Sequence, residues 1–472
     1  MRSRFSAWGL QLILAMLVGL GLLRSTQAKE ALRPHIVFFL IDDLGRNDVG
    51  FMGSKRFQTP QIDKLAHGGA ILDAHYVQPV CSPTRAALMT GRYATRTGVY
   101  TVVRPKAAWG LALEERILPQ ALHDAGYETA IVGKWHLGEF QTEYLPTARG
   151  FDHQYGHYFG MIDYFDHTRN GMRDWYRDDK PSSDAGYSTH LIAKEAVQRI
   201  EKRDKSKPLF LYVPFNGVHS PLQVPEKYTK EYANLPANQQ KLGGMLAAVD
   251  EAIGQIVAAL ESQGMRKETL ILFSSDNGGP NPQQLSSNGE LRAGKGTIYE
   301  GGVRVCAFAN WPEKIPAGKT STEPMHMIDW YPTLIQLAGG SVEQKLPVDG
   351  LNVWPMLSQG AKSPHEAILL VQSPTRAAVR MGDWKLLMNA SAQDSETAEE
   401  STPEKSKAKG KGKAKAKLQT SGNGYELYNL AEDRSESQNL AGKEPSRLKE
   451  MQSVLAGLLK DAVAPRHLGK QD

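Results

Sequence analysis

The stretch His35-Ile-Val-Phe-Phe-Leu-Ile41, followed at once by Asp42-Asp43, decides the fold class. Its apolar residues are mostly β-branched or aromatic, which is typical of a strand buried on both faces. Three later runs have the same character: residues 129–133, 209–215 and 270–275. Segments with helical spacing lie between the runs, most clearly 117–125 and 242–262. Strands that alternate with helices predict an α/β fold, with a mostly parallel sheet covered by helices on both faces.

Polar side chains follow each of the four runs. In chain order they are Asp42 and Asp43, then Lys134 and His136, then His219, and finally Asp276 and Asn277. In an open parallel sheet, ligand sites form beyond the carboxyl ends of the strands. We therefore expect these side chains to meet at one edge of the sheet.

Four of these residues carry oxygen donors: Asp42, Asp43, Asp276 and Asn277. Hard cations such as Ca²⁺ and Mg²⁺ take oxygen ligands, and Ca²⁺ takes more of them. Three converging carboxylates would repel one another without a cation. Zinc fits less well, because no His or Cys is paired with these carboxylates at ligand spacing. The pattern predicts a calcium or magnesium site.

Cys81 begins a segment, Cys81-Ser-Pro-Thr-Arg85, in which Pro83 suits the first turn of a helix and Gly91 its end. A helix N-terminus favours anions and activates a thiol nucleophile. The residues alone leave a plain cysteine hydrolase open, although a thiolate matches hard-cation ligands poorly. The only other cysteine, Cys306, lies in an apolar run and is interpreted as a buried core thiol.

Several stretches resemble type I sulfatases, whose signature C-x-P-x-R is followed by T-G-R. Here these elements read Cys81-Ser-Pro-Thr-Arg85 and Thr90-Gly-Arg92, and Gly133 to Gly138 is similar to the second signature of that family. Residues 218–225 and 294–304 resemble arylsulfatase B, the N-acetylgalactosamine-4-sulfatase, and its relatives. The resemblance runs from residue 34 to about 440. It departs from the family at Arg434, where many members have proline, and at a lysine-rich insert.

The resemblance implies a fold similar to alkaline phosphatase and a cysteine that is oxidised to formylglycine after synthesis. One calcium ion would be bound by Asp42, Asp43, Asp276, Asn277 and the group at position 81. The hydrated aldehyde at position 81 would attack sulfur, with Asp276 as the base and Arg85 orienting the diol. Its second hydroxyl could then expel the sulfate, which a serine could not do.

The resemblance also implies roles for the cations and histidines that follow the strands. Lys134, Lys295 and His219 would bind sulfate oxygens. His219 or Lys295 would protonate the leaving oxygen, and His136 would take the proton whose loss expels sulfate. Preorganised cations suit this chemistry, because negative charge develops on the bridging oxygen.

The implied function is hydrolysis of sulfate esters, by analogy those of sulfated galactosamine or galactose units in a polysaccharide. Two alternatives remain. One is a phosphate or phosphonate monoester hydrolase of the same fold, and the other is a non-catalytic binder of sulfated glycans if Cys81 stays unmodified. The expected partners are a sulfated glycan and a formylglycine-generating enzyme for maturation.

The chain divides into a catalytic domain, residues 34–362, and a smaller C-terminal domain, residues 363–472. Runs at 367–372, 375–381, 383–388 and Tyr425–Asn429 predict a small antiparallel sheet, and residues 448–459 predict a terminal helix. Residues 391–424 are acidic and then lysine-rich, so they cannot bury an apolar face and are expected to be disordered. We interpret them as a loop insertion, with tethering to a polyanion as the alternative.

The N-terminus reads as an export signal over residues 1–28. Arg2 and Arg4 precede a mostly apolar run at 7–23, and Thr26-Gln27-Ala28 offers a cleavage site. A membrane anchor is the alternative, but the run is short for a bilayer span. The protein is expected to be exported, to the periplasm or outside, with no stable membrane span.

The net charge of +5 depends on where the basic residues lie. Three arginines leave with the signal, and seven lysines lie between Lys405 and Lys417. The remaining chain is close to neutral, so the charge does not indicate a nucleic-acid partner.

Overall fold

The computed structural model describes residues 32–281, 285–390 and 424–468. The predicted export signal at 1–28 lies outside these ranges. So does the predicted insert at 391–424, apart from its last residue. The expectations for both segments stay predictions.

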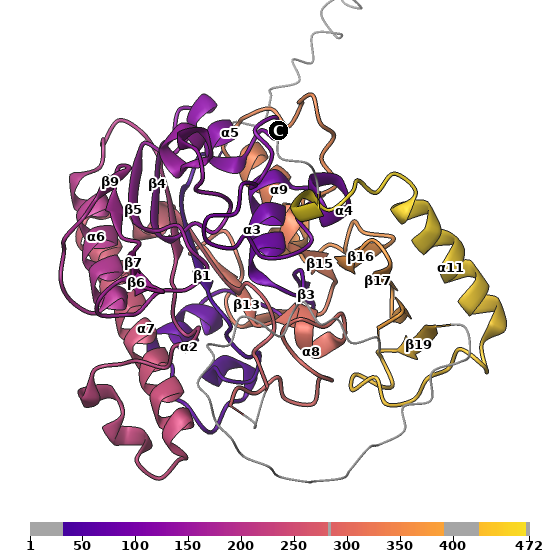
Figure 1. Ribbon diagram of the computed structural model, residues 1–472. Coiled ribbons are helices and arrows are strands. Elements are labelled where there is room, and N and C mark those ends of the chain that lie inside the picture. The colour runs from indigo at the N-terminus through magenta and orange to yellow at the C-terminus, as the bar shows by residue number, and fades with distance from the viewer. Residues whose placement is uncertain (1–31, 282–284, 391–423, 469–472) are drawn as a thin grey trace, which may run out of the picture.

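A ten-stranded mixed sheet runs through the protein in the order β14-β2-β13-β11-β1-β10-β4-β5-β8-β9 (Figure 1). The central neighbours β11, β1, β10, β4 and β5 are parallel, and antiparallel pairs occur on both sides of them. The four predicted runs are β1, β4, β10 and β11, so the mostly parallel sheet is confirmed. In sheet order, the bounds are Lys319–Ser321, Ala70–Leu72, Ala307–Asn310, Thr269–Ser275, His35–Ile41, Leu209–Pro214, Glu128–Lys134, His153–His157, Tyr176–Arg177 and Lys180–Pro181.

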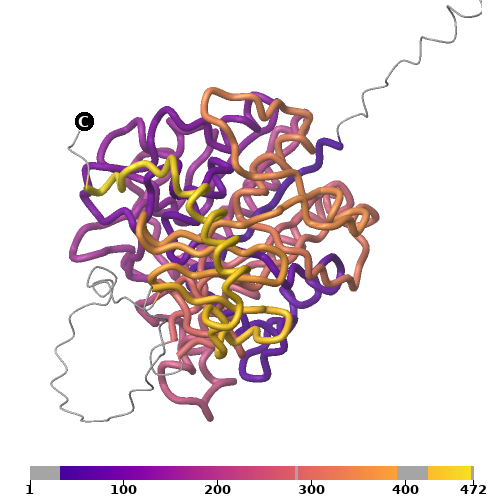
Figure 2. The backbone as a smooth tube through the Cα atoms, turned by 90° about the vertical axis from the view of Figure 1, so that its right-hand side faces the viewer, coloured from indigo at the N-terminus to yellow at the C-terminus, as the bar shows by residue number. Residues whose placement is uncertain are grey.

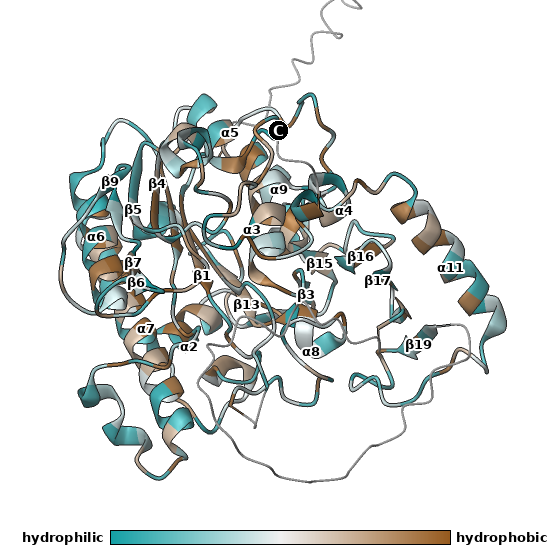
Figure 3. Cartoon of the chain, viewed as in Figure 1, coloured by the Kyte–Doolittle hydropathy of each residue, from teal (hydrophilic) through white to brown (hydrophobic). Residues whose placement is uncertain are grey.

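Helices cover both faces of this sheet because alternate residues of each central strand point to opposite sides. On one side of β1, Val37 and Phe39 share a buried core with α2 (Pro60–His67), α6 (Ser188–Lys202) and α7 (Ala237–Ser262). On the other side, Ile36 and Phe38 pack with α3 (Cys81–Thr90), α5 (Leu118–Asp124), α9 (Trp330–Leu337) and α10 (Trp354–Gln359). Full burial of each such side chain contributes about 1.5–3 kcal/mol. Figure 3 shows the central strands in the brown of apolar residues.

Helix α7 begins five residues before the predicted start, at Ala237. It is the one helix among the described residues that is long and apolar enough to cross a membrane. However, 67% of its apolar window is buried inside the protein, against α6 and α2. Packing in the core therefore accounts for its composition.

The predicted C-terminal sheet is present as an antiparallel array of β16 (Ile368–Ser373), β17 (Arg376–Met381), β18 (Trp384–Met388) and β19 (Tyr425–Asn429). Helix α11 (Pro445–Leu459) packs against β17 and β18. Figure 2 shows this yellow and orange part lying over one side of the molecule. The domain boundary at residue 362 stays a prediction. The other strands and α-helices of the described residues are β3 (His75–Tyr76), β12 (Arg304–Val305), β15 (Met325–His326), β6 (Thr168–Arg169), β7 (Met172–Arg173), α4 (Ala94–Thr97) and α8 (Glu300–Val303).

A buried ion network joins the C-terminal sheet to the rest of the protein. The Lys385 side chain on β18 is fully buried, and its Nζ lies 2.8 Å from Glu300 Oε1 on α8 and 2.9 Å from Glu436 Oε1. Burial would raise the pKa of Glu300, but Lys385 and nearby arginines lower it to about 2. Burial raises the pKa of Glu436 to about 7 despite Lys385. Lys385 and Arg304 together thus offset the cost of burying the Glu300 carboxylate.

Replacing Lys385 by methionine should lower the free energy of unfolding by about 3–5 kcal/mol, because it removes the cation that two buried carboxylates, Glu300 and Glu436, share. Urea unfolding followed by fluorescence measures this change. Lys362→Met is the matched control, since Lys362 pairs with Glu323 at 2.8 Å but its side chain is 91% exposed. The prediction is wrong if the two variants unfold at the same urea concentration.

Candidate active site

The polar edge of the sheet is built by the register of its central strands. Ile41 on β1 lies opposite Ser275 on β11, so the residues that follow, Asp42 and Asp276, are placed side by side. The Asp276 N–H donates to Ile41 O at 3.0 Å, and the Asp43 N–H donates to Asp276 Oδ1 at 3.2 Å. The structure therefore places Asp42, Asp43 and Asp276 together at this edge.

Cys81 enters the same edge from the first turn of α3. The helix begins at Cys81 and ends before Gly91, whose φ of 67° is left-handed, as the sequence predicted. The Cys81 Sγ and one carboxylate oxygen each of Asp42 and Asp276 lie within 4.8 Å of one another. Both cysteines of the chain are buried, and neither forms a disulfide. Cys306 is packed in the core, as predicted.

Each carboxylate at this edge has a cationic neighbour. Lys134 Nζ lies 2.6 Å from Asp42 Oδ2. Arg85 Nη2 lies 2.7 Å from Asp276 Oδ2, and both side chains are fully buried. Lys295 Nζ lies 2.9 Å from Asp43 Oδ1. The structure thus brings together all three cations that the sequence pointed to.

The two central carboxylates differ in their affinity for protons. Burial would raise the pKa of Asp42, but its cationic neighbours, led by Lys134, hold the pKa well below its ordinary value. Burial and the nearby Asp42 carboxylate raise the pKa of Asp276 to about 6, although Arg85 opposes the shift. Crowded carboxylates of this kind favour a bound cation.

Two buried oxygens at this edge lack hydrogen-bond partners among the described residues, and they fit a metal ion. Asp42 Oδ1 and Asn277 Oδ1 are buried and have no hydrogen-bond partner among the described residues. A buried polar atom without a partner is costly, and an ion would supply the missing interaction. Asp42, Asp43 and His219 also offer ligand atoms within 4.8 Å of one another. His219 was expected at this edge but was not among the predicted metal ligands.

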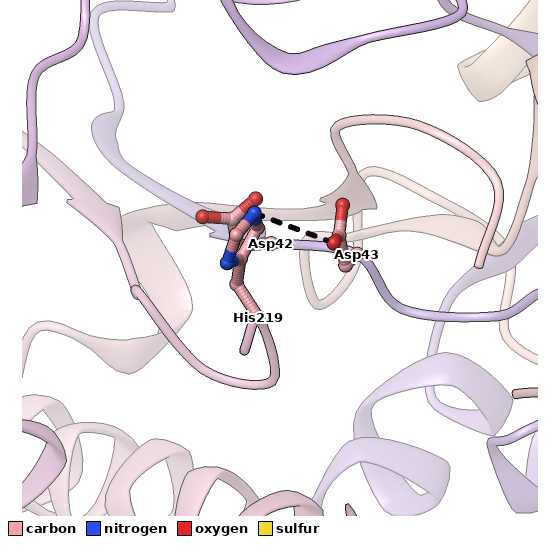
Figure 4. Close-up of side chains that lie close together, drawn as sticks. All are labelled: Asp42, Asp43 and His219. Carbon is pink, nitrogen blue, oxygen red and sulfur yellow. Dashed lines mark ion pairs between the residues drawn. The ribbon is translucent and has the colours of Figure 1, made fainter. Parts of the chain in front are cut away.

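His219 presents its Nε2 to this cluster (Figure 4). Its Nδ1 lies 2.6 Å from Ser220 O, which makes Nδ1 the protonated nitrogen in the neutral ring. Its Nε2 lies 3.2 Å from Lys295 Nζ and 3.5 Å from Asp43 Oδ2. His219 and Lys295, for which the resemblance implies shared roles, therefore lie side by side.

His136 is held in a left-handed conformation, with φ of 60°, which is uncommon for a residue other than glycine. Its Nε2 lies 2.9 Å from Val103 O, and its carbonyl accepts a bond from the Ser82 hydroxyl at 2.9 Å. A Cβ on Gly160 would lie 2.6 Å from the imidazole, so only glycine fits there. His136 is thus fixed beside the start of α3.

Sequence reasoning missed the residues that hold this site in place. Val103, Gly160 and Tyr164 lie in loops without periodicity and distant from the signature segments.

Two motif residues lie outside the site. Arg304 pairs with Asp73 and Glu300, and Trp135 is packed in the core.

Sequence comparison places the chain in a family. The sequence profile of the Sulfatase family matches residues 34–341. Arylsulfatase J from Mus musculus is 39% identical over 362 residues, which are 75% of this chain and 60% of that protein. N-acetylgalactosamine-6-sulfatase from Canis lupus familiaris is 32% identical over 411 residues, which are 80% of this chain and 75% of that protein.

A comparison with solved structures supports the same family. The solved structure of Ps i-CgsB in complex with k-i-k-neocarrahexaose has a TM-score of 0.80 and 31% sequence identity. The match covers 92% of this chain and 94% of that one. The fold, the site and these relatives define an enzyme that hydrolyses sulfate esters. The chain belongs to the Sulfatase family. The finer resemblance to arylsulfatase B stays a prediction.

Proposed function

We propose that this enzyme removes sulfate groups from sulfated carbohydrates, using a formylglycine made from Cys81 and one calcium ion. The observation that carries the proposal is the position of Cys81, whose Sγ lies with Asp42 and Asp276 oxygens inside a 4.8 Å cluster. An unmodified thiolate is a poor companion for hard-cation ligands. An oxygen nucleophile at the same position suits them.

The ion would be bound by Asp42, Asp43, Asp276, Asn277 and the residue-81 group, and it would polarise a sulfate oxygen as a Lewis acid. Oxygen donors favour calcium over zinc, and the partnerless Asp42 Oδ1 and Asn277 Oδ1 suit such an ion. Cys81 oxidised to formylglycine would supply a hydrated aldehyde with one hydroxyl for attack and a second to expel sulfate.

The chain's own side chains would orient the reacting groups and move protons. Arg85 fixes the Asp276 carboxylate next to position 81, where Asp276 can take the proton of the attacking hydroxyl. Lys134 adds positive charge beneath the sulfate site. Loss of that charge would weaken binding of the negatively charged transition state.

His219 and Lys295 would act together at the leaving oxygen. The 3.2 Å between Lys295 Nζ and His219 Nε2 lets either group carry the proton that the departing alkoxide needs. His136, held at Val103 O, would accept the proton whose loss releases sulfate. The two halves of the reaction thus use different histidines.

Sulfated galactose or galactosamine units are the proposed substrates. Two relatives support this class, since one is named for N-acetylgalactosamine and the other was solved with neocarrahexaose. We further propose that the protein is exported, to the periplasm or outside, and that a formylglycine-generating enzyme matures it.

Release of inorganic sulfate from defined oligosaccharides tests the proposal. Sulfated galactose and galactosamine oligosaccharides should release sulfate faster than sulfated glucosamine oligosaccharides, as measured by ion chromatography. Phosphate esters of substituted phenols should react much more slowly than sulfate esters of the same phenols. Faster phosphate than sulfate release would favour a phosphomonoester hydrolase, and glycan binding without release would favour a non-catalytic binder.

A further inference from the structure

The loop that carries His219 is attached on one side to the end of β1. The Asp42 N–H donates to Gly217 O at 3.0 Å, and the Val218 N–H donates to Asp42 O at 2.8 Å. These two bonds align the loop with the metal-binding edge. They hold the backbone at residues 217 and 218, before His219. The orientation of residue 219 itself therefore depends on other contacts.

Tyr164 supplies a contact on the other side of the loop. Its hydroxyl lies 2.6 Å from Asn216 O and 2.7 Å from His219 O, and the side chain is 1% exposed. A phenol has one proton to donate, so the two carbonyls share it in a three-centre bond. The bond closes the loop from residue 216 to residue 219 at its base.

Tyr164 is itself rigidly held, which is what allows it to position another residue. Its N–H donates to Gln223 Oε1 at 2.9 Å, and its carbonyl accepts the Ser188 N–H at 2.8 Å. Its ring stacks on Tyr187 with centroids 5.5 Å apart. Gln223 Nε2 also donates to Asp163 at 2.6 Å. The hydroxyl therefore has little freedom to follow a moving loop.

The orientation of the His219 ring depends on this backbone. The Nδ1 bond to Ser220 O at 2.6 Å fixes the ring relative to its own main chain. Rotation of the main chain at residue 219 would thus carry Nε2 away from Lys295 Nζ and Asp43 Oδ2. A hydrogen bond to His219 O opposes that rotation.

We propose that Tyr164 is a positioning residue that sets the orientation of His219 for proton transfer to the leaving oxygen. This inference rests on the proposed role of His219 in the reaction. Proton donation matters most when the leaving group is a weak acid, such as a sugar hydroxyl, and least when it is a nitrophenol. Loss of the Tyr164 hydroxyl should therefore change the dependence of the rate on the leaving group.

The experiment measures kcat and KM for a series of substituted phenyl sulfates, from nitrophenyl to methoxyphenyl. The proteins compared are the wild type, Tyr164→Phe, His219→Ala and Tyr187→Phe. Tyr187 is the matched control, because it is buried beside Tyr164 and its hydroxyl donates to Gln223 O at 3.1 Å, not to a carbonyl of residues 216–219. Thermal unfolding of each variant separates loss of fold from loss of proton transfer.

We expect Tyr164→Phe to lower kcat about tenfold for methoxyphenyl sulfate and less than about twofold for nitrophenyl sulfate. His219→Ala should increase the dependence of kcat on the leaving group more than Tyr164→Phe does, while Tyr187→Phe should follow the wild type. A Tyr164→Phe series parallel to that of the wild type, or equal to that of Tyr187→Phe, would overturn the inference. A His219→Ala series parallel to that of the wild type would instead refute the proposed role of His219.

Discussion

Cys81→Ser should lower turnover of an aryl sulfate by at least about 10³-fold, as is common when a nucleophile is lost. A serine hydroxyl at the start of α3 could still attack sulfur, but it has no second hydroxyl with which to expel the sulfate. The variant should therefore stop after a single transfer. Stopped and continuous assays with nitrophenyl sulfate measure the difference.

Cys306→Ala is the matched control, because Cys306 is equally buried but lies in the apolar core. Its activity should stay close to that of the wild type. In the wild-type protein, mass spectrometry of the tryptic peptide from Leu65 to Arg85 should show a loss of about 18 mass units relative to cysteine, as an aldehyde requires. An active enzyme with an intact thiol at position 81 would refute the formylglycine proposal.

Removing divalent cations with EGTA should abolish activity, and calcium should restore it. A ligand present at a hundred times its Kd stabilises the folded state by about 2.7 kcal/mol, so calcium should also raise the Tm. Asp42→Asn should lose this calcium-dependent rise in Tm, because it weakens a ligand at the centre of the cluster. The Tm readout does not depend on the state of Cys81.

Asp48→Asn is the control for the calcium prediction. Asp48 is buried in the loop after β1, but it bonds to Arg56 and Ser286 and not to the metal-binding cluster. Its calcium-dependent rise in Tm should be retained. A rise in Tm produced by zinc but not by calcium would contradict the assignment of calcium to this site. Zinc is the informative comparison because His219 and Cys81 both lie close to the aspartates.

The sequence could predict the parts of the fold that have strong periodicity. The apolar runs of β1, β4, β10 and β11 stand out because they are buried almost throughout, and α7 stands out because its buried residues recur at helical spacing from Leu242 to Leu260. The short strands β2, β13 and β14 at one end of the sheet could not be found, since they have three or four residues and take their conformation from their neighbours. The buried Lys385 was also hidden, because its ion partners lie on distant segments.

The candidate site could be predicted as far as its chemistry follows strand ends and signature motifs. Asp42 and Asp276 come directly after strands and Lys134 ends one, so their meeting follows from the sheet. The supports of His136 and His219 were not predictable, because contacts of Gly160 and Tyr164 depend on how loops fold back. Local sequence thus indicates which groups react, and tertiary structure decides how they are oriented.

The burial of Cys81 has a consequence for how active protein is produced. The thiol is 0% exposed and lies in the first turn of a helix that packs in the core. If residue 81 is oxidised, the oxidising enzyme must meet this segment before α3 folds, because the finished structure shields it. Oxidation and folding then compete in time, and fast synthesis would yield soluble, correctly folded and permanently inactive molecules. The specific activity of a preparation would therefore depend on how the protein was produced as well as on its sequence.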